Sequence, residues 1–332
     1  MNYVPHPEYA AYIEANSHGF IDVWTENGKT CTKLHCDHEP TEEDLRAVEL
    51  RMKILLDYEM PDGMTMEDIQ ITGPDGDPLR LRIYRPKNLP EKSPILMNVH
   101  GGGWIGGALD IDNSRAIALA QGTPCIVVSV DYRIARNGIH FPKPLQDCVC
   151  AYRWLCGHAE KIGGDSKRIA LHGTSAGGNL CAGLALYLRD HGDQPPRLTV
   201  LNCAALYMDN AEGISAYQYQ SVKAEGYNYA KSVMAQYLGG LDGMAPSYYA
   251  LPGLCPDVSG LGPHAVITAE YEWLRDDSFR YVTRLLRAAV PCEMILAPRV
   301  DHAFCAVDSA RLTQWTHAGI CMSLRREFGM PL

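Results

Sequence analysis

Short apolar runs alternate with segments of helical periodicity along most of this chain. Seven runs predict strands, and they lie at about 79–84, 94–99, 125–130, 168–172, 198–203, 264–268 and 292–296. Between most of these runs, apolar residues recur at helical spacing, which predicts helices with one buried face. Apolar strands that alternate with helices are typical of a parallel sheet covered by helices on both faces. The pattern therefore predicts an α/β fold with a mostly parallel, twisted sheet.

Two segments do not follow this alternation. The first, residues 1–60, begins with a polar stretch and ends with an amphipathic helix that we predict over 42–58. The apolar residues at helical spacing in that helix are Leu45, Val48, Met52, Leu55 and Leu56. The second segment, residues 207–250, is rich in tyrosine and favours helix in parts. We expect both segments to be additions to the alternating sheet and helices.

A serine lies in the motif Gly-x-Ser-x-Gly between one of these strands and a helix. Residues 173–177 read Gly-Thr-Ser-Ala-Gly, with Ser175 at the centre, and an apolar helical segment follows at 180–188. The glycines permit the sharp turn that is typical of a nucleophile elbow. Ser175 is therefore the candidate nucleophile. The backbone N–H of Ala176 is a candidate donor to an oxyanion formed there.

A glycine-rich segment follows the strand predicted at 94–99. It begins with His-Gly-Gly-Gly-Trp at 100–104 and ends at Gly107. Backbone N–H groups can approach a developing oxyanion only where no side chain intervenes, and glycine meets that condition. A nucleotide-binding loop of the Walker type would end in Gly-Lys-Ser or Gly-Lys-Thr, and this segment does not. Gly102 and Gly103 are therefore further candidate oxyanion donors.

Together, the two motifs resemble those of the hormone-sensitive-lipase family of α/β-hydrolase esterases. The resemblance covers roughly residues 75–330. It includes Asp-Tyr-Arg at 131–133, the segment 265–276, which corresponds to the acid-bearing segment of the family, and Val-Asp-His-Ala-Phe at 300–304. The resemblance implies the α/β-hydrolase fold and a catalytic triad in the chain order serine, acid, histidine.

The resemblance also implies which residues complete this triad. His302 stands where the family has its general base. Glu272 stands where the family has the first aspartate of Asp-Pro-Leu-Arg-Asp, and Trp273 replaces the proline that follows. Glutamate serves as the acid in some α/β-hydrolases, so we expect Glu272 to orient His302. Asp276 and Asp277 remain alternatives for the acid.

In the resembled family, a helical cap covers the pocket and shapes its specificity. We expect the cap to comprise residues 1–60 and 207–250, and the catalytic core to comprise residues 61–206 and 251–332. Rigid aromatic side chains are suited to lining such a pocket. Trp104 and Tyr207 are accordingly the candidate substrate-binding residues.

Composition and charge limit the partners of this protein. The content of 46% hydrophobic and 21% charged residues is ordinary for a globular protein. A net charge of −9 argues against nucleic acids and anionic membrane surfaces as partners. Residues 1–7 lack the basic region and apolar core of a signal peptide, and no apolar stretch is long enough to span a bilayer. We therefore expect a cytoplasmic protein with no nucleic-acid or membrane partner.

The 12 cysteines are scattered, and none belongs to a Cys-x-x-Cys pair with a matching partner. Without an export signal, free thiols in a reducing cytoplasm are the expected state. The group of His35, Cys36 and His38 leaves a zinc site there as an alternative. We nevertheless expect the protein to require no metal and no organic cofactor.

The sequence therefore predicts a serine carboxylesterase that hydrolyses small-molecule esters through an acyl-enzyme intermediate. Its preference for short acyl chains is what the resemblance implies. Deacetylation of acetylated sugars and acyl transfer are alternatives that use the same triad. A ligand-binding protein without catalysis is an alternative of another class, although the relatives of that kind have lost the histidine. Dimerisation through the edge of the last strand is common in the resembled family, so a homodimer is among the expected states.

Overall fold

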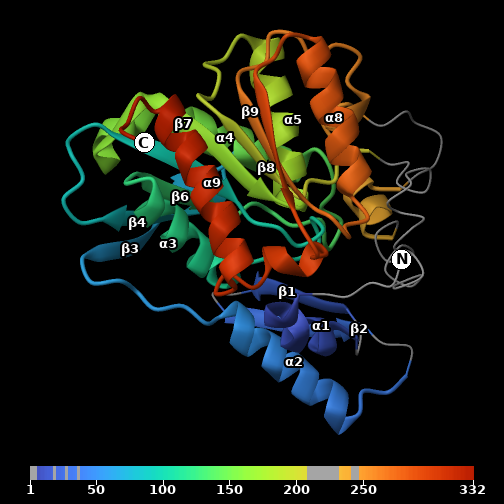
Figure 1. The fold of residues 1–332 in the computed structure, drawn as a ribbon. Coiled ribbons are helices and arrows are strands. Elements are labelled where there is room, and N and C mark those ends of the chain that lie inside the picture. Colours follow the sequence, from blue (N-terminus) through green and yellow to red (C-terminus); the bar gives the residue numbers. More distant parts are fainter. Residues whose placement is uncertain (1–5, 18–19, 27–28, 36–37, 208–231, 241–246) are drawn as a thin grey trace.

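An eight-stranded sheet forms the centre of the computed structural model, which describes residues 6–17, 20–26, 29–35, 38–207, 232–240 and 247–332 (Figure 1). The strand order is β10-β9-β8-β7-β5-β6-β4-β3. The strands are β3 (Met64–Thr72), β4 (Pro78–Pro86), β5 (Ser93–Val99), β6 (Ile126–Val130), β7 (Gly164–Thr174), β8 (Thr199–Asn202), β9 (His264–Ala269) and β10 (Cys292–Ala297). All seven predicted strands are present, and the sheet has one strand more.

The additional strand is β3, which pairs antiparallel with β4 at one edge of the sheet. Strand β4 also runs antiparallel to β6, whereas all pairs from β6 through β5, β7, β8 and β9 to β10 are parallel. Most side chains of β3 are partly or fully exposed, while those of β5 and β6 are all buried. The apolar signal is therefore weak in β3, which explains why the sequence pattern did not predict it.

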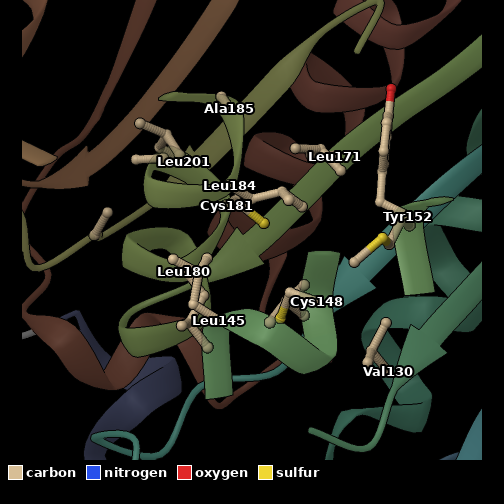
Figure 2. Packing of buried hydrophobic residues seen from close by; sticks show 14 of the residues in the cluster. Val130, Leu145, Cys148, Tyr152, Leu171, Leu180, Cys181, Leu184, Ala185 and Leu201 are labelled. Carbon is tan, nitrogen blue, oxygen red and sulfur yellow. The ribbon is translucent and has the colours of Figure 1, made fainter. Parts of the chain in front are cut away.

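Helices cover both faces of the sheet, as the alternating pattern predicts. The principal helices are α3 (Asn113–Gly122), α4 (Lys143–His158), α5 (Ala176–His191), α8 (Arg275–Arg287) and α9 (Arg311–Glu327). Buried residues of α4, α5 and α8 form one apolar cluster with the sheet, and those of α3 and α9 form another. Figure 2 shows the first cluster, in which Leu145 and Cys148 of α4 lie near Leu180 and Leu184 of α5. The strands thus contribute apolar side chains to two cores.

Short 3-10 helices lie in several of the connections. They are η1 (Pro7–Tyr9), η2 (Asp110–Asp112), η3 (Ala159–Ile162), η6 (Pro252–Leu254) and η7 (His302–Cys305). The described helices include none that is long and apolar enough to cross a membrane.

The N-terminal segment packs beside the main sheet in Figure 1. It comprises α1 (Ala10–Ser17), an antiparallel pair of strands β1 (Phe20–Glu26) and β2 (Lys29–His35), and α2 (Glu42–Leu55). Strand β1 contacts the glycine-rich segment, because Gly107 N–H donates to the carbonyl of Val23 at 2.5 Å. Arg136 strengthens this contact, since it pairs with Asp22 at 2.5 Å and lies 4.2 Å from the centre of the Trp24 ring.

The predicted helix at 42–58 forms as α2, but its buried face differs from the prediction. Ala47 and Leu55 are buried, whereas Leu45 and Leu56 are exposed. Thr41 and Asp44 fix the start of the helix as a capping box, in which each side chain accepts from the backbone N–H of the other. The expectation that all five spaced apolar residues share one buried face was therefore wrong for Leu45 and Leu56.

The second expected cap segment, 207–250, lies largely outside the described residues. Its described parts are Tyr207, 232–240 and 247–250, and residues 232–238 are helical. Within this helix, Tyr237 stacks on Trp104 with ring centres 4.6 Å apart. The helix therefore lies against the glycine-rich segment. The division into a core and a cap stays a prediction.

Candidate active site

Ser175 occupies the turn between β7 and α5. Its φ of 56° and ψ of −118° are unfavourable for a residue with a side chain, and such a conformation costs roughly 1–3 kcal/mol. Two glycines make the turn possible, because a Cβ on Gly173 would collide with the carbonyl of Gly177, and a Cβ on Gly177 would collide with that of Val99. The Ser175 N–H donates to the carbonyl of Asn202 at 2.8 Å. The packing therefore holds the serine in a strained turn at the end of its strand.

His302 connects Ser175 to Glu272. The distance from His302 Nε2 to Ser175 Oγ is 3.1 Å, and the distance from His302 Nδ1 to Glu272 Oε1 is 2.5 Å. Ser175 follows β7, Glu272 follows β9 and His302 follows β10, so all three lie beyond the carboxyl ends of parallel strands. In this geometry a serine could pass its proton to a histidine that a carboxylate orients.

Burial and the Glu272 carboxylate shift the pKa of His302 in opposite directions. Burial is the largest single cause and lowers this pKa, but the charge of Glu272 and its hydrogen bond, with smaller contributions from Cys305 and Asp301, outweigh burial and raise the pKa to about 9. The Glu272 side chain itself has no exposed surface, so water screens this interaction little. The site therefore stabilises a positive charge on His302.

The two alternative acids make other contacts. One oxygen of Asp277 accepts the backbone N–H groups of Leu206 and Tyr207, both at 3.0 Å. Asp276 forms an ion pair of 3.3 Å with its neighbour Arg275. Asp277 thus anchors the chain that leaves β8, and the carboxylate in contact with His302 is that of Glu272.

The glycine-rich segment passes directly beside the nucleophile. A Cβ on Gly101 would lie 3.4 Å from the Ser175 Cβ. Gly102 has a φ of 125° and Gly103 a φ of 61°, and the Gly106 N–H donates to the Gly102 carbonyl at 2.9 Å. Side chains at Gly102 would collide with the backbone of Gly106, so this tight turn needs glycine. Glycines at these positions therefore leave the backbone of the segment uncovered by side chains, a condition that an oxyanion hole also requires.

Aromatic side chains hold the glycine-rich segment at His100 and Trp104. His100 stacks on Tyr132 with ring centres 4.3 Å apart, and the Tyr132 hydroxyl donates to the His100 carbonyl at 3.1 Å. Trp104 is buried, and its indole N–H donates to Asn179 Oδ1 at 3.1 Å. Asn179 belongs to α5, so Trp104 ties the glycine-rich segment to the helix that follows the nucleophile.

Tyr207 lies at a surface cavity of about 600 Å³ beside α8. The residues that line the cavity are Tyr207, Gly253, Leu254, Phe279, Arg280, Thr283, Arg284 and Arg287. The Tyr207 ring is buried, with the Arg280 guanidinium 3.9 Å from its centre.

Among the residues of the alternative zinc site, His35 bonds to Asp22 and His38 to Asp44, while Cys36 lies outside the described residues.

Sequence reasoning missed Arg115, which supports the turn that carries His302. Arg115 is 4% exposed and donates to the carbonyl of Cys305, the last residue of that turn. It also forms ion pairs with Asp112 and, at 3.4 Å, with Asp308. In the sequence, Asp112 lies near the glycine-rich segment and Asp308 lies near the motif of His302. Nothing in the spacing of these two aspartates points to Arg115. The contact exists because α3 and α9 cover the same face of the sheet.

Comparison with known proteins agrees with this geometry. A family model described as the alpha/beta hydrolase fold matches residues 96–306, which is more than half of the chain. The matched range contains Ser175, Glu272 and His302.

Individual esterases are similar to most of the chain. The esterase LipI of Mycobacterium tuberculosis is 32% identical over 270 residues, which cover 79% of this chain and 82% of LipI. The carboxylesterase NlhH of the same organism is 36% identical over 228 residues, which cover 68% of this chain and 70% of NlhH. A solved esterase structure from Pyrobaculum calidifontis superposes with a TM-score of 0.75 at 30% identity, covering 85% of this chain and 90% of that one.

Proposed function

Since the chain belongs to the hormone-sensitive-lipase family of α/β-hydrolase esterases and is a carboxylic ester hydrolase, we propose that it cleaves short-chain acyl esters of small molecules through an acyl-enzyme on Ser175. The observation that carries this proposal is the continuous contact from Ser175 Oγ through His302 to Glu272. A protein that only binds ligands has no need for such a chain of contacts.

In the first step, Ser175 Oγ attacks the ester carbonyl carbon while its proton passes to His302 Nε2. The 3.1 Å between these atoms is within hydrogen-bond reach, as the transfer demands. Glu272 accepts a hydrogen bond from the Nδ1–H group of His302, which leaves Nε2 unprotonated and able to act as the base. The product of this step is a tetrahedral intermediate with a negative oxygen.

The N–H groups of Gly102, Gly103 and Ala176 are the donors that we assign to that oxygen. The glycine-rich segment beside Ser175 supports the first two, and the position of Ala176 at the start of α5 supports the third. Donors at a helix N-terminus also benefit from the helix dipole. The loss of one such donor typically lowers kcat by about 10²- to 10³-fold.

Collapse of the intermediate completes the first half of the reaction. The bond from carbon to the alcohol oxygen breaks, His302 returns its proton to that oxygen, and the alcohol leaves an acylated Ser175. Water then attacks the acyl group, with His302 again taking and returning a proton, and the carboxylic acid is released. The Ser175 proton leaves with the alcohol, and a proton from the attacking water restores the serine, so the reaction as proposed requires no metal or organic cofactor.

One observation supports a short acyl chain. The Val233 side chain comes near Gly103, since a Cβ there would lie 3.5 Å from a Val233 methyl group, so the helix at 232–238 restricts the space beside the oxyanion segment. Trp104 lies within that segment, and we assign it to the acyl side of the pocket. We also propose Tyr207 for the alcohol side, but the cavity that it lines beside α8 includes none of Ser175, Glu272 and His302, so that cavity does not support this assignment.

We also propose a cytoplasmic location. The 11 cysteines within the described residues all have free thiols, which a reducing compartment preserves.

The test is hydrolysis of p-nitrophenyl esters from acetate to laurate by the wild type, Ser175→Ala and Ser309→Ala. Ser309 is exposed and serves as the matched control. We expect activity to fall with chain length, to be unchanged in Ser309→Ala and to drop by roughly 10⁴-fold or more in Ser175→Ala. Mass spectrometry after a quench should show an acyl adduct on Ser175. A fully active Ser175→Ala variant would overturn the proposal, and so would a wild type that neither turns over nor forms the adduct.

A further inference from the structure

Two thiols lie beside the catalytic histidine. Cys203 directly follows β8, and Cys305 is the last residue of η7, the turn that begins at His302. One ligand atom from each of Cys203, His302 and Cys305 lies within 4.8 Å of those of the other two. Both thiols are buried, whereas the His302 side chain is 36% exposed. The cluster is therefore reached from solvent on the histidine side.

Separate parts of the fold hold the two thiols in place. The Cys203 N–H donates to the carbonyl of Ile267 in β9 at 2.8 Å, and its φ of 50° is one that few residues with side chains adopt. The Cys305 carbonyl accepts from the buried Arg115, and its thiol lies 3.9 Å from Asn202 Oδ1. Because backbone contacts fix each cysteine, the convergence of the two sulfur atoms on His302 is a property of the fold.

Two sulfur atoms and one imidazole nitrogen are a donor set that Zn²⁺ prefers. With Zn–S bonds of about 2.3 Å and Zn–N bonds of about 2.0 Å, donors in a tetrahedral site lie roughly 3.5–3.8 Å apart. From at most 4.8 Å, the three donors would therefore need to approach one another by up to about 1.3 Å, which rotation of the side chains can supply. The negative charge of Glu272, which contacts His302, also favours a cation there.

We propose that Cys203, His302 and Cys305 form an inhibitory site for a thiophilic divalent cation, with Zn²⁺ as the ion that fits the donor set. This inference rests on the proposed function, because it gives His302 a second and competing role. On binding, two thiol protons leave to the solvent, two Zn–S bonds and one Zn–N bond form, and water fills the fourth position. If Nε2 binds the metal, it no longer accepts a proton, and if Nδ1 binds the metal, the remaining imidazole proton lies on Nε2. In either case Ser175 loses its base. A chelator reverses the reaction.

The experiment compares the wild type with Cys203→Ala, Cys305→Ala and the control Cys125→Ala. Cys125 is also fully buried, but it directly precedes β6 and so lies at the opposite end of the parallel strands. Each protein is freed of metal with EDTA and kept reduced with a phosphine that does not bind metals strongly. Zn²⁺ is then titrated against hydrolysis of p-nitrophenyl butyrate. In parallel, Co²⁺ is titrated while its thiolate charge-transfer absorption is recorded, since this signal does not depend on activity.

We expect Zn²⁺ to inhibit the wild type and Cys125→Ala equally and EDTA to restore both. In Cys203→Ala and Cys305→Ala, the inhibition constant should rise at least about 10-fold, since even changes outside the ligand shell typically weaken metal binding 10- to 100-fold. The cobalt absorption should weaken in the same two variants. Equal inhibition of all four proteins, or a wild type without the thiolate absorption, would overturn the inference. A wild type that binds Co²⁺ through thiolates but hydrolyses no ester would overturn the proposed function and leave the metal site intact.

Discussion

Glu272 Oε1 lies 2.5 Å from His302 Nδ1, and the carboxylate that makes this contact is completely buried. A buried charge is stable only where a partner compensates it, and here the partner is an imidazole that also touches Ser175. The contact therefore does two things. It selects the tautomer that directs Nε2 at the serine, and it raises the pKa of His302 against the opposing effect of burial.

The first prediction concerns the pH dependence of the reaction. His302 must be unprotonated to act as a base, so kcat/KM falls as the pH drops through the pKa of His302. That pKa is raised, so the acidic limb of the wild-type profile should lie above pH 6.5. Glu272→Gln removes the charge that raises the pKa, and we expect the limb to move to lower pH while kcat falls by roughly 10²- to 10⁴-fold. The measurement is kcat/KM against pH with EDTA present.

Asp276→Asn is the matched control for this prediction. It removes one negative charge four residues further along the chain, where the carboxylate pairs with Arg275. Its acidic limb should match that of the wild type. If the acidic limb moved in Asp276→Asn and stayed in place in Glu272→Gln, the acid would be Asp276 and not Glu272.

The second prediction concerns the glycine-rich segment. Gly102→Ala adds a Cβ that collides with the backbone of Gly106, so the segment must move away from its position beside Ser175. We expect kcat to fall by about 10²-fold or more, the typical effect of losing an oxyanion donor. Gly138→Ala is the control, because Gly138 also has a positive φ but has open space around it. It should lose about 1–2 kcal/mol of stability from backbone strain and keep its kcat. Equal kcat values for the two variants would contradict the prediction.

The third prediction concerns the buried Arg115. Arg115→Met leaves Asp112 and Asp308 without their cation, and breaking a buried pair of this kind typically costs about 3–5 kcal/mol. In the wild type, the neighbouring His317 adds no charge to this network at neutral pH, because burial lowers its pKa to about 4. Urea unfolding measures the loss. Arg46→Met, which removes an exposed pair with Glu42, is the control and should change the free energy of unfolding by less than about 0.5 kcal/mol. A similar loss of unfolding free energy in both variants would contradict the prediction, because the buried pairs would then contribute no more than the exposed pair.

The fourth prediction concerns self-association. In the described part of the chain, β10 pairs only with β9, and Leu296 on this edge strand is 42% exposed. Helix α9 packs beside β10 and exposes Trp315 and Met322. Apolar residues at an open edge favour pairing with a second copy, so we expect a homodimer through this edge. Sedimentation velocity should show a dimer for the wild type and for Leu45→Glu, which changes an exposed leucine of α2, but a monomer for Leu296→Glu. A monomeric wild type would make the prediction wrong.

The sequence predicted the strands well, because most of them are buried on both faces and so form continuous apolar runs. Strand β3 was not predicted, because it lies at an edge of the sheet and exposes most of its side chains. The helix α2 was predicted, yet its buried face was partly wrong. Leu45 and Leu56 match the helical period, but only packing against other elements decides which stripe of a helix is covered.

The candidate site shows the same limit. Ser175, Glu272 and His302 lie in motifs that are local in sequence, so the sequence could nominate them, and the structure brings them into contact. Arg115 and Cys203 lie in no motif. Arg115 comes near the turn of His302 only because α3 packs against that turn. Cys203 comes near His302 only because β8 lies between β7 and β9. Contacts of this kind depend on long-range topology, which the local pattern does not report.

The order of the strands has a consequence for how such a protein can diversify. Along the sheet, β7, β8, β9 and β10 are consecutive neighbours, and the three proposed catalytic residues follow three of them. Hydrogen bonding sets the spacing between neighbouring strands, so the reacting atoms keep their positions whatever the length of the connections. The long connection from β8 to β9 can therefore gain, lose or exchange residues during evolution without displacing the reaction centre. Selection can in this way change the choice of ester while the chemistry is inherited unchanged.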